Sequence, residues 1–119
     1  MSHRAVRLGE EMKKEIAQML RDELKDPRIG FVTVTKVDVA NDLGHAKVFV
    51  SILGSEEEKR QSMQALIKAT GFVRSEIARR IRLRYAPEIV FKLDESIEQG
   101  VRIASLLEQV KVKNKPEES

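Results

Sequence analysis

A single glycine inside a long helical pattern constrains this sequence more than any other feature. Within residues 65–84, apolar side chains recur at helical spacing both before and after Gly71. A glycine in a helix interior costs about 1 kcal/mol relative to alanine, which favours a role in turning the chain. We therefore predict a helix that reaches about Thr70, a kink at Gly71, and a second helix that continues to about Arg84.

The segment after Gly71 is rich in arginine. Five arginines fall within eleven residues, and Glu76 is the one acidic residue among them. These arginines are Arg74, Arg79, Arg80, Arg82 and Arg84. A guanidinium group makes paired contacts with phosphate, and a helix that starts after a glycine presents free backbone N–H groups. The pattern favours a nucleic-acid surface over an ordinary solvated helix face.

A second basic stripe occurs in the N-terminal segment, from about Arg4 to Lys25. Apolar residues at helical spacing predict a long amphipathic helix, and they are Ala5, Leu8, Met12, Ile16, Met19 and Leu20. The opposite side of this helix carries Arg7, Lys14, Gln18, Arg21 and Lys25. Two interpretations stay open for this stripe, a second contact with nucleic acid and a solvated helix face.

Strand and turn signals follow the first helix. The segment 26–28, Asp-Pro-Arg, ends the helix because the residue before a proline avoids helical geometry. β-Branched residues predict strands over 31–39 and 46–53, joined by a hairpin turn at 41–44.

Two serines mark further helix starts. Ser55 and Glu58 form a capping box, and Ser96 is placed to cap a helix that follows a short strand over 89–93. The predicted class is α+β, a three-stranded sheet packed against helices in the order helix, strand, strand, helix, kink, helix, strand, helix. We expect one domain over residues 1–110 and a disordered tail over 111–119.

Composition narrows the functional classes. The 119 residues include no cysteine, which excludes disulfides and thiolate metal sites. No apolar run exceeds three residues, so the sequence predicts neither a transmembrane segment nor a secretory signal. The net charge is only +3, and the clustering of the arginines therefore predicts local basic surfaces on a cytoplasmic protein.

The turn after the first strand holds the one group of residues that resembles a metal site. Asp38, Asn41, Asp42 and His45 offer oxygen and imidazole ligands. The same residue types also hydrogen-bond the backbone in hairpin turns, and we favour that interpretation. No phosphate loop, dinucleotide motif or activated nucleophile is recognisable, so we expect no enzyme, no catalytic residue, no metal and no cofactor.

The order of elements resembles the type II K-homology (KH) domain, although the Gly-x-x-Gly loop of that domain is replaced here by Ala69-Thr70-Gly71. This replacement is similar to the variant seen in the ribosome-binding factor A family. Further motifs that resemble that family extend from Arg4 to about Leu107. They are Asp26-Pro27-Arg28, Val32-Thr33-Val34-Thr35, Asp42-Leu43, the run from His45 to Ser51, Leu83-Arg84, Pro87-Glu88-Ile89 with Phe91, and the run from Gly100 to Ile103.

The resemblance implies a non-enzymatic factor that binds the immature 30S (small) ribosomal subunit and its 16S rRNA. It implies support of late assembly and of rRNA processing at the 5′ end, in the cold as well as in normal growth. The expected partners are the free or precursor subunit and its rRNA, with no membrane, for a monomeric protein. Whether an assembly GTPase assists stays open.

The residues predicted to bind RNA combine this resemblance with charge and helix face. They are Lys68, Ala69, Gly71, Arg74, Arg79, Arg80, Arg82 and Arg84, together with Arg7, Lys14, Arg21 and Arg28. One alternative is a protein–protein interaction module that binds an acidic partner, through the exposed sheet face or through Phe49 and Leu53. A metal-dependent nuclease that uses the turn from Asp38 to His45 is a third hypothesis.

Overall fold

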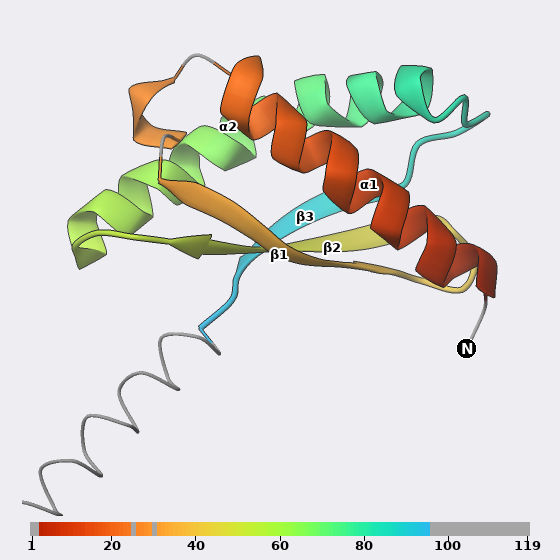
Figure 1. Ribbon diagram of the computed structural model, residues 1–119, viewed down its shortest axis with the longest axis horizontal. Coiled ribbons are helices and arrows are strands. Elements are labelled where there is room, and N and C mark those ends of the chain that lie inside the picture. Colours follow the sequence, from red (N-terminus) through yellow and green to blue (C-terminus); the bar gives the residue numbers. More distant parts are fainter. Residues whose placement is uncertain (1–2, 25, 30, 96–119) are drawn as a thin grey trace, which may run out of the picture.

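The structure is a computed structural model that describes residues 3–24, 26–29 and 31–95 (Figure 1). The elements in chain order are α1 (His3–Asp22), the 3-10 turn η1 (Pro27–Ile29), β1 (Val32–Val39), β2 (His45–Ile52), α2 (Glu56–Arg80) and β3 (Glu88–Leu93). Each of the three predicted strands is confirmed to within one residue at either end.

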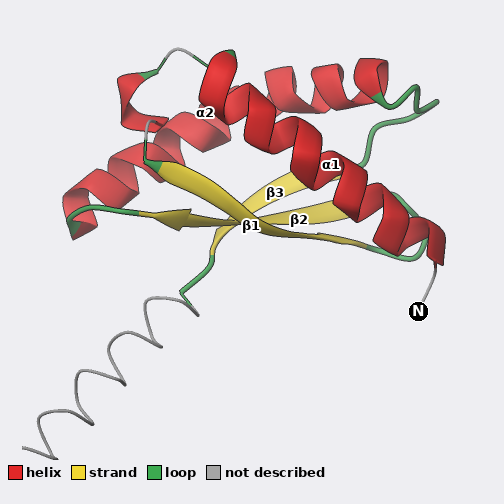
Figure 2. Cartoon of the chain, in the orientation of Figure 1, coloured by secondary structure: helices red, strands yellow, loops and turns green. Residues whose placement is uncertain are grey.

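The three strands form one mixed sheet in the order β1-β2-β3. The hairpin strands β1 and β2 run antiparallel, whereas β2 and β3 run parallel, and α2 makes the crossover between them. Figure 2 shows α1 and α2 on the same side of the sheet. The predicted α+β class, with a three-stranded sheet packed against helices, is confirmed.

The core lies between the two helices and the covered face of the sheet. The central strand β2 alternates as predicted, because Ala46, Val48, Val50 and Ile52 are buried and the residues between them are not. The apolar stripe of α1 is buried as predicted. It consists of Ala5, Leu8, Met12, Ile16, Met19 and Leu20.

Helix α1 approaches the sheet edge closely at Gly9, a residue that the sequence pattern did not single out. A β-carbon built at Gly9 would lie 2.7 Å from the backbone carbonyl oxygen of Val37 in β1. Only glycine therefore allows α1 to lie this close to β1 without displacing the strand.

Helix α2 begins where the sequence predicts. The Ser55 hydroxyl accepts a hydrogen bond from the Glu58 backbone N–H at 3.2 Å, and the Glu58 carboxylate accepts one from the Ser55 N–H at 2.7 Å. These bonds form the predicted capping box. The backbone bond from Ser55 lowers the pKa of Glu58 and keeps its carboxylate ionised at the positive end of the helix dipole.

The helix does not break at Gly71. It is continuous from Glu56 to Arg80, so the prediction of two separate helices is wrong, although the direction of α2 changes along its course in Figure 1. The hydroxyl of Thr70 bonds to the carbonyl oxygen of Leu66 at 3.2 Å, a contact that bends helices without ending them. The helix remains whole because both halves bury apolar residues, Leu66 before the glycine and Val73 after it.

Helix α2 ends four residues earlier than predicted, at Arg80 instead of Arg84. Arg82 adopts the left-handed conformation with φ of 58°, and the backbone N–H of Leu83 bonds back to the carbonyl oxygen of Ala78 at 3.0 Å. This arrangement is a helix-ending motif in which glycine is the usual residue. An arginine at this position gives no sequence signal for the end of a helix.

Some predictions concern residues outside the described part of the chain. They include the helix capped by Ser96 and the tail over 111–119. Within the described ranges, no helix is both long enough and apolar enough to cross a membrane.

Candidate nucleic-acid interface

The outer surface of α2 around Gly71 faces solvent. Lys68 and Gly71 are exposed, and the apolar side chains of Ile67 and Phe72 are 62% and 44% exposed. Ala69 is half-buried and packs against the core. The predicted residues Lys68 and Gly71 therefore lie on an open surface, whereas Ala69 supports that surface from beneath.

Gly71 has no steric role within the described fold. A β-carbon built at Gly71 would meet no heavy atom within 4 Å, apart from its chain neighbours and the nearby backbone of its own helix. A glycine here still costs about 1 kcal/mol relative to alanine. Since packing does not require the glycine, its benefit must lie in the bend of α2 or in a partner that approaches the bare backbone.

The turn that follows α2 carries arginines directed to solvent. Arg82 and Arg84 are exposed, and neither makes an ion pair with a carboxylate of the described residues. The Arg84 guanidinium lies 5.7 Å from the centre of the Tyr85 ring, which is itself 79% exposed. Such unpaired guanidinium groups are available to bind phosphate.

Two other predicted arginines are tied to their own chain but remain exposed. The Arg74 guanidinium donates to the carbonyl oxygen of Ala86 at 3.1 Å, which links α2 to the segment before β3. Arg79 pairs with Glu76 at 2.6 Å, and its side chain is 69% exposed. This hydrogen bond lowers the pKa of Glu76. Glu76 is only 19% exposed and also pairs with Arg80, so it keeps a cation when the exposed Arg79 guanidinium turns to a phosphate.

Arg80 differs from its neighbours because its guanidinium is engaged within the fold. Its side chain is only 15% exposed and bonds to Glu15 at 3.2 Å, Gln18 at 3.1 Å and Glu76 at 3.2 Å. It also pairs with Glu23, and that bond is the main cause of the raised pKa of Arg80. Arg80 therefore joins α2 to α1, and its role in the described structure is positional.

The partners of Arg80 were missed by sequence reasoning, which found Glu76 as the one local counter-charge. Glu15 and Glu23 come from the N-terminal region, and they stand four residues before and after the buried Met19. Side chains at this spacing share one helix face. Acidic residues at the edge of the apolar stripe of α1 were the available signal for a buried cation from elsewhere in the chain.

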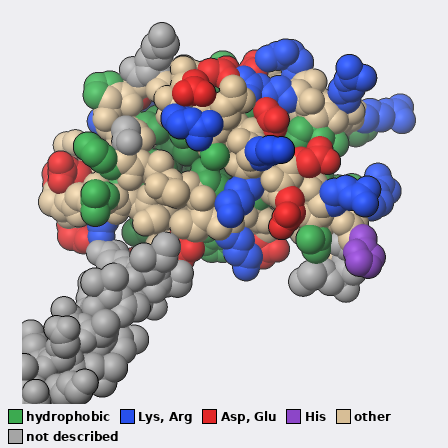
Figure 3. All heavy atoms as spheres, viewed as in Figure 1, with side chains coloured by type: hydrophobic (Ala, Val, Ile, Leu, Met, Phe, Trp, Pro, Cys, Tyr) green, Lys and Arg blue, Asp and Glu red, His purple; other side chains and the backbone are tan. Residues whose placement is uncertain are grey.

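The basic stripe of α1 is partly free. Arg7 and Lys14 are exposed without an ion pair to a described carboxylate, whereas Arg21 lies 3.7 Å from Asp22. Gln18 accepts the bond from Arg80. Figure 3 shows Lys and Arg side chains gathered mainly over the right-hand half of this face, with acidic side chains among them.

Arg28 is held by its own turn. Its guanidinium bonds to Asp26 at 2.7 Å, and this bond is the first cause of the lowered pKa of Asp26, about 2. The carbonyl oxygen of Arg28 accepts a hydrogen bond from the Ser62 hydroxyl, which fixes η1 against α2. Lys68 adds a favourable charge interaction with Asp26, so the turn lies near the exposed side of α2.

The hairpin turn is a structural element. The Asp42 carboxylate accepts a hydrogen bond from the Gly44 backbone N–H at 2.8 Å, and Leu43 adopts the left-handed conformation with φ of 61°. No group of three or more His, Cys, Asp or Glu side chains suited to a metal ion occurs among the described residues.

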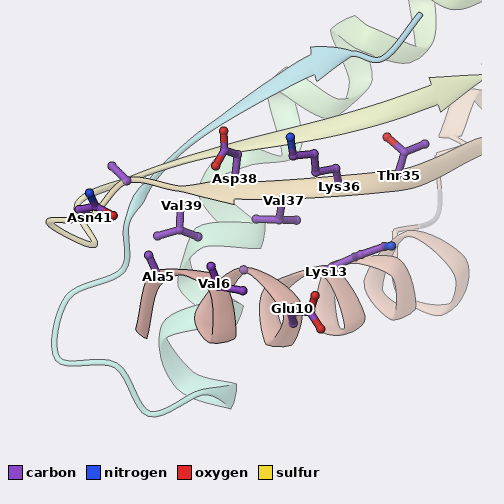
Figure 4. Close-up of a pocket in the computed structure, with 12 residues that line it drawn as sticks. Ala5, Val6, Glu10, Lys13, Thr35, Lys36, Val37, Asp38, Val39 and Asn41 are labelled. Carbon is purple, nitrogen blue, oxygen red and sulfur yellow. The ribbon is translucent and has the colours of Figure 1, made fainter. Parts of the chain in front are cut away.

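A pocket of about 690 Å³ lies between α1 and β1. Figure 4 shows Val37 and Val39 pointing from β1 toward α1, while Lys36 and Asp38 point away from it. Glu10 and Lys13 are the charged residues that α1 contributes to the lining. The pocket therefore has an apolar floor with scattered charges of both signs, and it does not bring together the predicted RNA-binding residues.

These features define the class of protein. A three-stranded sheet with both helices on one face and an exposed basic helix is a KH-like α+β domain. Residues 4–107 match the family described as ribosome-binding factor A. The chain belongs to the ribosome-binding factor A family, and the resemblance inferred from its motifs is confirmed. That description names a binding factor and no reaction.

Individual relatives agree with this assignment. Ribosome-binding factor A of Desulfitobacterium hafniense is 60% identical over 116 residues, which are 98% of this chain and 93% of the relative. The crystal structure of ribosome-binding factor A from Thermus thermophilus matches with a TM-score of 0.66 and 28% identity, over 75% of this chain and 94% of that one.

A further Thermus thermophilus structure is a homology model of ribosome binding factor A fitted into the cryo-EM map of a 30S complex. It matches with a TM-score of 0.56 and 27% identity, and it covers 71% of this chain and 93% of the other.

Proposed function

We propose that this protein binds the immature 30S ribosomal subunit through its 16S rRNA and assists late assembly and processing of the rRNA 5′ end. It acts in the cytoplasm without catalysing a reaction. The observation that carries the proposal is the row of exposed cations along the outer surface of α2 and the following turn, with the bare backbone of Gly71 among them. The Thermus thermophilus relative fitted into a 30S complex supports the same partner.

The geometry of this surface suits a folded RNA. Lys68 and Arg79 are separated by about 16 Å along α2, at 1.5 Å per residue, and Arg82 lies beyond the end of the helix. Cations spread over this length contact phosphates of more than one nucleotide, and they read backbone shape instead of base sequence. At Gly71 a phosphate or ribose can approach the helix backbone more closely than any side chain would allow.

Binding of this kind stabilises one arrangement of the rRNA. A ligand shifts a conformational equilibrium by the difference between its affinities for the two states. The protein therefore assists maturation by favouring the rRNA arrangement that matches its rigid basic surface. Because the contacts are mainly with phosphate, affinity should fall by about 0.7 to 0.9 log units per log unit of salt for each phosphate neutralised.

The test is a charge reversal at the exposed arginines. Arg79→Glu combined with Arg82→Glu should abolish co-sedimentation with purified immature small subunits, while the melting temperature changes by only a few degrees. Arg60→Glu is the matched control for the first substitution, because Arg60 also pairs with a glutamate three residues earlier, Glu57, at the other end of α2. The control variant should bind as the unchanged protein does.

Retention of subunit binding by the double variant would reject this surface as the RNA contact. Crosslinking of the protein to the same subunits, followed by mapping of the crosslinked nucleotides, gives an independent reading. Crosslinks through Lys68 to 16S rRNA are expected, and crosslinks confined to ribosomal proteins would instead favour an interaction module that binds an acidic partner.

A further inference from the structure

The second face of the sheet carries no helix among the described residues. Figures 1 and 2 show α1 and α2 together on the opposite side. Residues of β2 that point to this open face alternate with the buried ones, and they are His45, Lys47, Phe49 and Ser51. The open face therefore has its own side-chain pattern, independent of the core.

An aromatic ring stands at the centre of this face between two lysines. Phe49 in β2 is paired with Lys36 in β1 and with Lys92 in β3, so the three residues form one row across the sheet. Both lysines are exposed, and the Lys36 ammonium lies 5.7 Å from the centre of the Phe49 ring. Figure 4 confirms that Lys36 points away from α1.

The neighbouring rows extend the same chemistry. Lys47 in β2 is exposed and lies opposite Val90 of β3, which is 50% exposed. On the other side of the central row, Thr33 pairs with Ser51. Leu53 at the end of the hairpin is 76% exposed, so apolar, hydroxyl and ammonium groups are interleaved across the face.

The strand beneath the ring is rigidly held. A bulge in β1 places Thr35 so that its hydroxyl bonds to the Phe49 carbonyl oxygen at 3.3 Å and to the Asp94 carboxylate at 2.6 Å. The flanking residues Val48 and Val50 are fully buried on the covered side. Phe49 is thus presented by a fixed strand, which lowers the entropy cost of binding a ligand on it.

We infer that this open sheet face binds unpaired RNA bases, as a contact separate from the outer surface of α2. A base stacks on the Phe49 ring, while Lys36 and Lys92 contact the phosphates on either side. Aromatic residues on an open sheet are a recurrent means of holding single-stranded RNA, because every base has a face that stacks. The inference rests on the proposed function for its partner class, RNA, and extends it to single-stranded segments.

The distribution of charge favours RNA over a protein partner. In the row that contains the ring both neighbours are cations, and the nearest acids of this face stand in the adjacent rows, where Asp38 lies opposite Lys47 and Asp94 is bonded to Thr35. Glu88 lies toward the hairpin turn. An apolar protein surface would need a continuous apolar patch, which lysine and hydroxyl side chains interrupt here.

The test uses the full chain and a fluorescently labelled ten-nucleotide single-stranded oligoadenylate, with the corresponding RNA duplex for comparison. Phe49→Leu should weaken single-strand binding about tenfold, within the range expected for loss of one stacked base. Phe49→Tyr should restore binding because it retains a stacking ring. Lys36→Gln with Lys92→Gln should weaken binding and reduce its salt dependence, whereas Lys13→Gln with Arg60→Gln, an equal change of charge elsewhere, should not.

Equal affinity of the Phe49→Leu and Phe49→Tyr variants for the oligonucleotide would overturn the inference, and so would a preference for the duplex. The melting temperature of both variants shows whether the leucine variant is folded. The charge reversal at Arg79 and Arg82 distinguishes this contact from the proposed function. That variant should no longer bind small subunits but should still bind the oligonucleotide. Loss of the oligonucleotide by that variant alone would place single-strand binding on α2 and reject the sheet face.

Discussion

Two helix glycines, Gly9 in α1 and Gly71 in α2, occupy opposite kinds of surface. Gly9 is buried, and its missing side chain lets α1 lie against the backbone of β1, where a β-carbon would come within 2.7 Å of a carbonyl oxygen. Gly71 is exposed, and a β-carbon there would meet no heavy atom within 4 Å outside its own stretch of helix. The conformational cost of Gly9 is offset by packing, whereas that of Gly71 is not offset by any side-chain contact in the described fold.

Arg80 and Arg82 repeat this contrast two residues apart. Arg80 donates to side chains of both helices and is 15% exposed, whereas Arg82 is exposed and holds a left-handed backbone conformation that L-residues avoid. Contacts within the described fold therefore account for Gly9 and for the guanidinium of Arg80, whereas they account neither for Gly71 nor for the exposed guanidinium of Arg82. The contrast assigns Gly9 and Arg80 to stability, and it supports the proposal that Gly71 and Arg82 contact RNA.

The largest effect is expected at Gly9. Gly9→Ala should lower the free energy of unfolding by about 1 to 2 kcal/mol, because overpacking against the β1 backbone outweighs the roughly 1 kcal/mol that alanine contributes in helix propensity. Urea denaturation followed by circular dichroism measures this change. Unchanged or increased stability would show that α1 can move away from β1 at little cost.

The next effect separates the neighbouring arginines. Arg80→Gln should lower the melting temperature by several degrees, because it leaves the carboxylates of Glu15, Glu23 and Glu76 close together without their shared cation. Arg79→Gln removes one exposed ion pair and should leave melting nearly unchanged. At a temperature where both variants are folded, Arg79→Gln should weaken subunit binding more than Arg80→Gln does. Greater loss of binding in the Arg80 variant would contradict the distinction between a stabilising Arg80 and an RNA-binding Arg79.

Substitution of Gly71 by alanine should stabilise the protein, in contrast to the same substitution at Gly9. Gly71→Ala should raise the free energy of unfolding by about 0.5 to 1 kcal/mol, since the new methyl group meets open space and the helix gains propensity. Its affinity for small subunits should nevertheless fall, which denaturation and co-sedimentation measure together. A variant that is more stable and binds subunits equally well would show that Gly71 does not contact RNA and serves only the bend of α2.

The smallest effect on stability is expected at Arg82. Arg82→Gly should raise the free energy of unfolding by about 0.5 kcal/mol, the difference between the left-handed penalty of an L-residue and the entropy cost of glycine. The variant should bind subunits more weakly because a free guanidinium is lost. Arg82→Ala is the control, since it loses the same group but keeps the backbone penalty, and it should bind as weakly without being stabilised.

Local patterns in the sequence were sufficient for most elements of the fold. The alternation in β2, the capping box of α2 and the apolar stripe of α1 were predicted because each depends on side chains within a few residues. The end of α2 was not, since an arginine in a left-handed conformation has no sequence signature. The kink predicted at Gly71 does not divide α2 into two helices, because the cost of one glycine is small beside the burial on both sides of it.

The sequence identified the arginines of the candidate site, but it did not show which of them are engaged within the fold and which are exposed. Charge and spacing identified the arginines near the end of α2, yet the difference between Arg79 and Arg80 depends on Glu15 and Glu23, more than fifty residues away. Long-range contacts of this kind are set by how the two helices pack. Exposure at Arg82 and Arg84 likewise became visible only once the turn after α2 was in place.

The parallel pairing of β2 with β3 bears on how the chain matures during its own synthesis. The β1–β2 hairpin closes locally, but the second edge of β2 finds its partner only after the whole of α2 and then Glu88–Leu93 have left the ribosomal exit tunnel. Until then Val48 and Val50 sit at an unprotected strand edge, open to pairing with other nascent chains. Truncation before β3 should therefore yield aggregated product, because the sheet is complete only after Glu88–Leu93 has been translated.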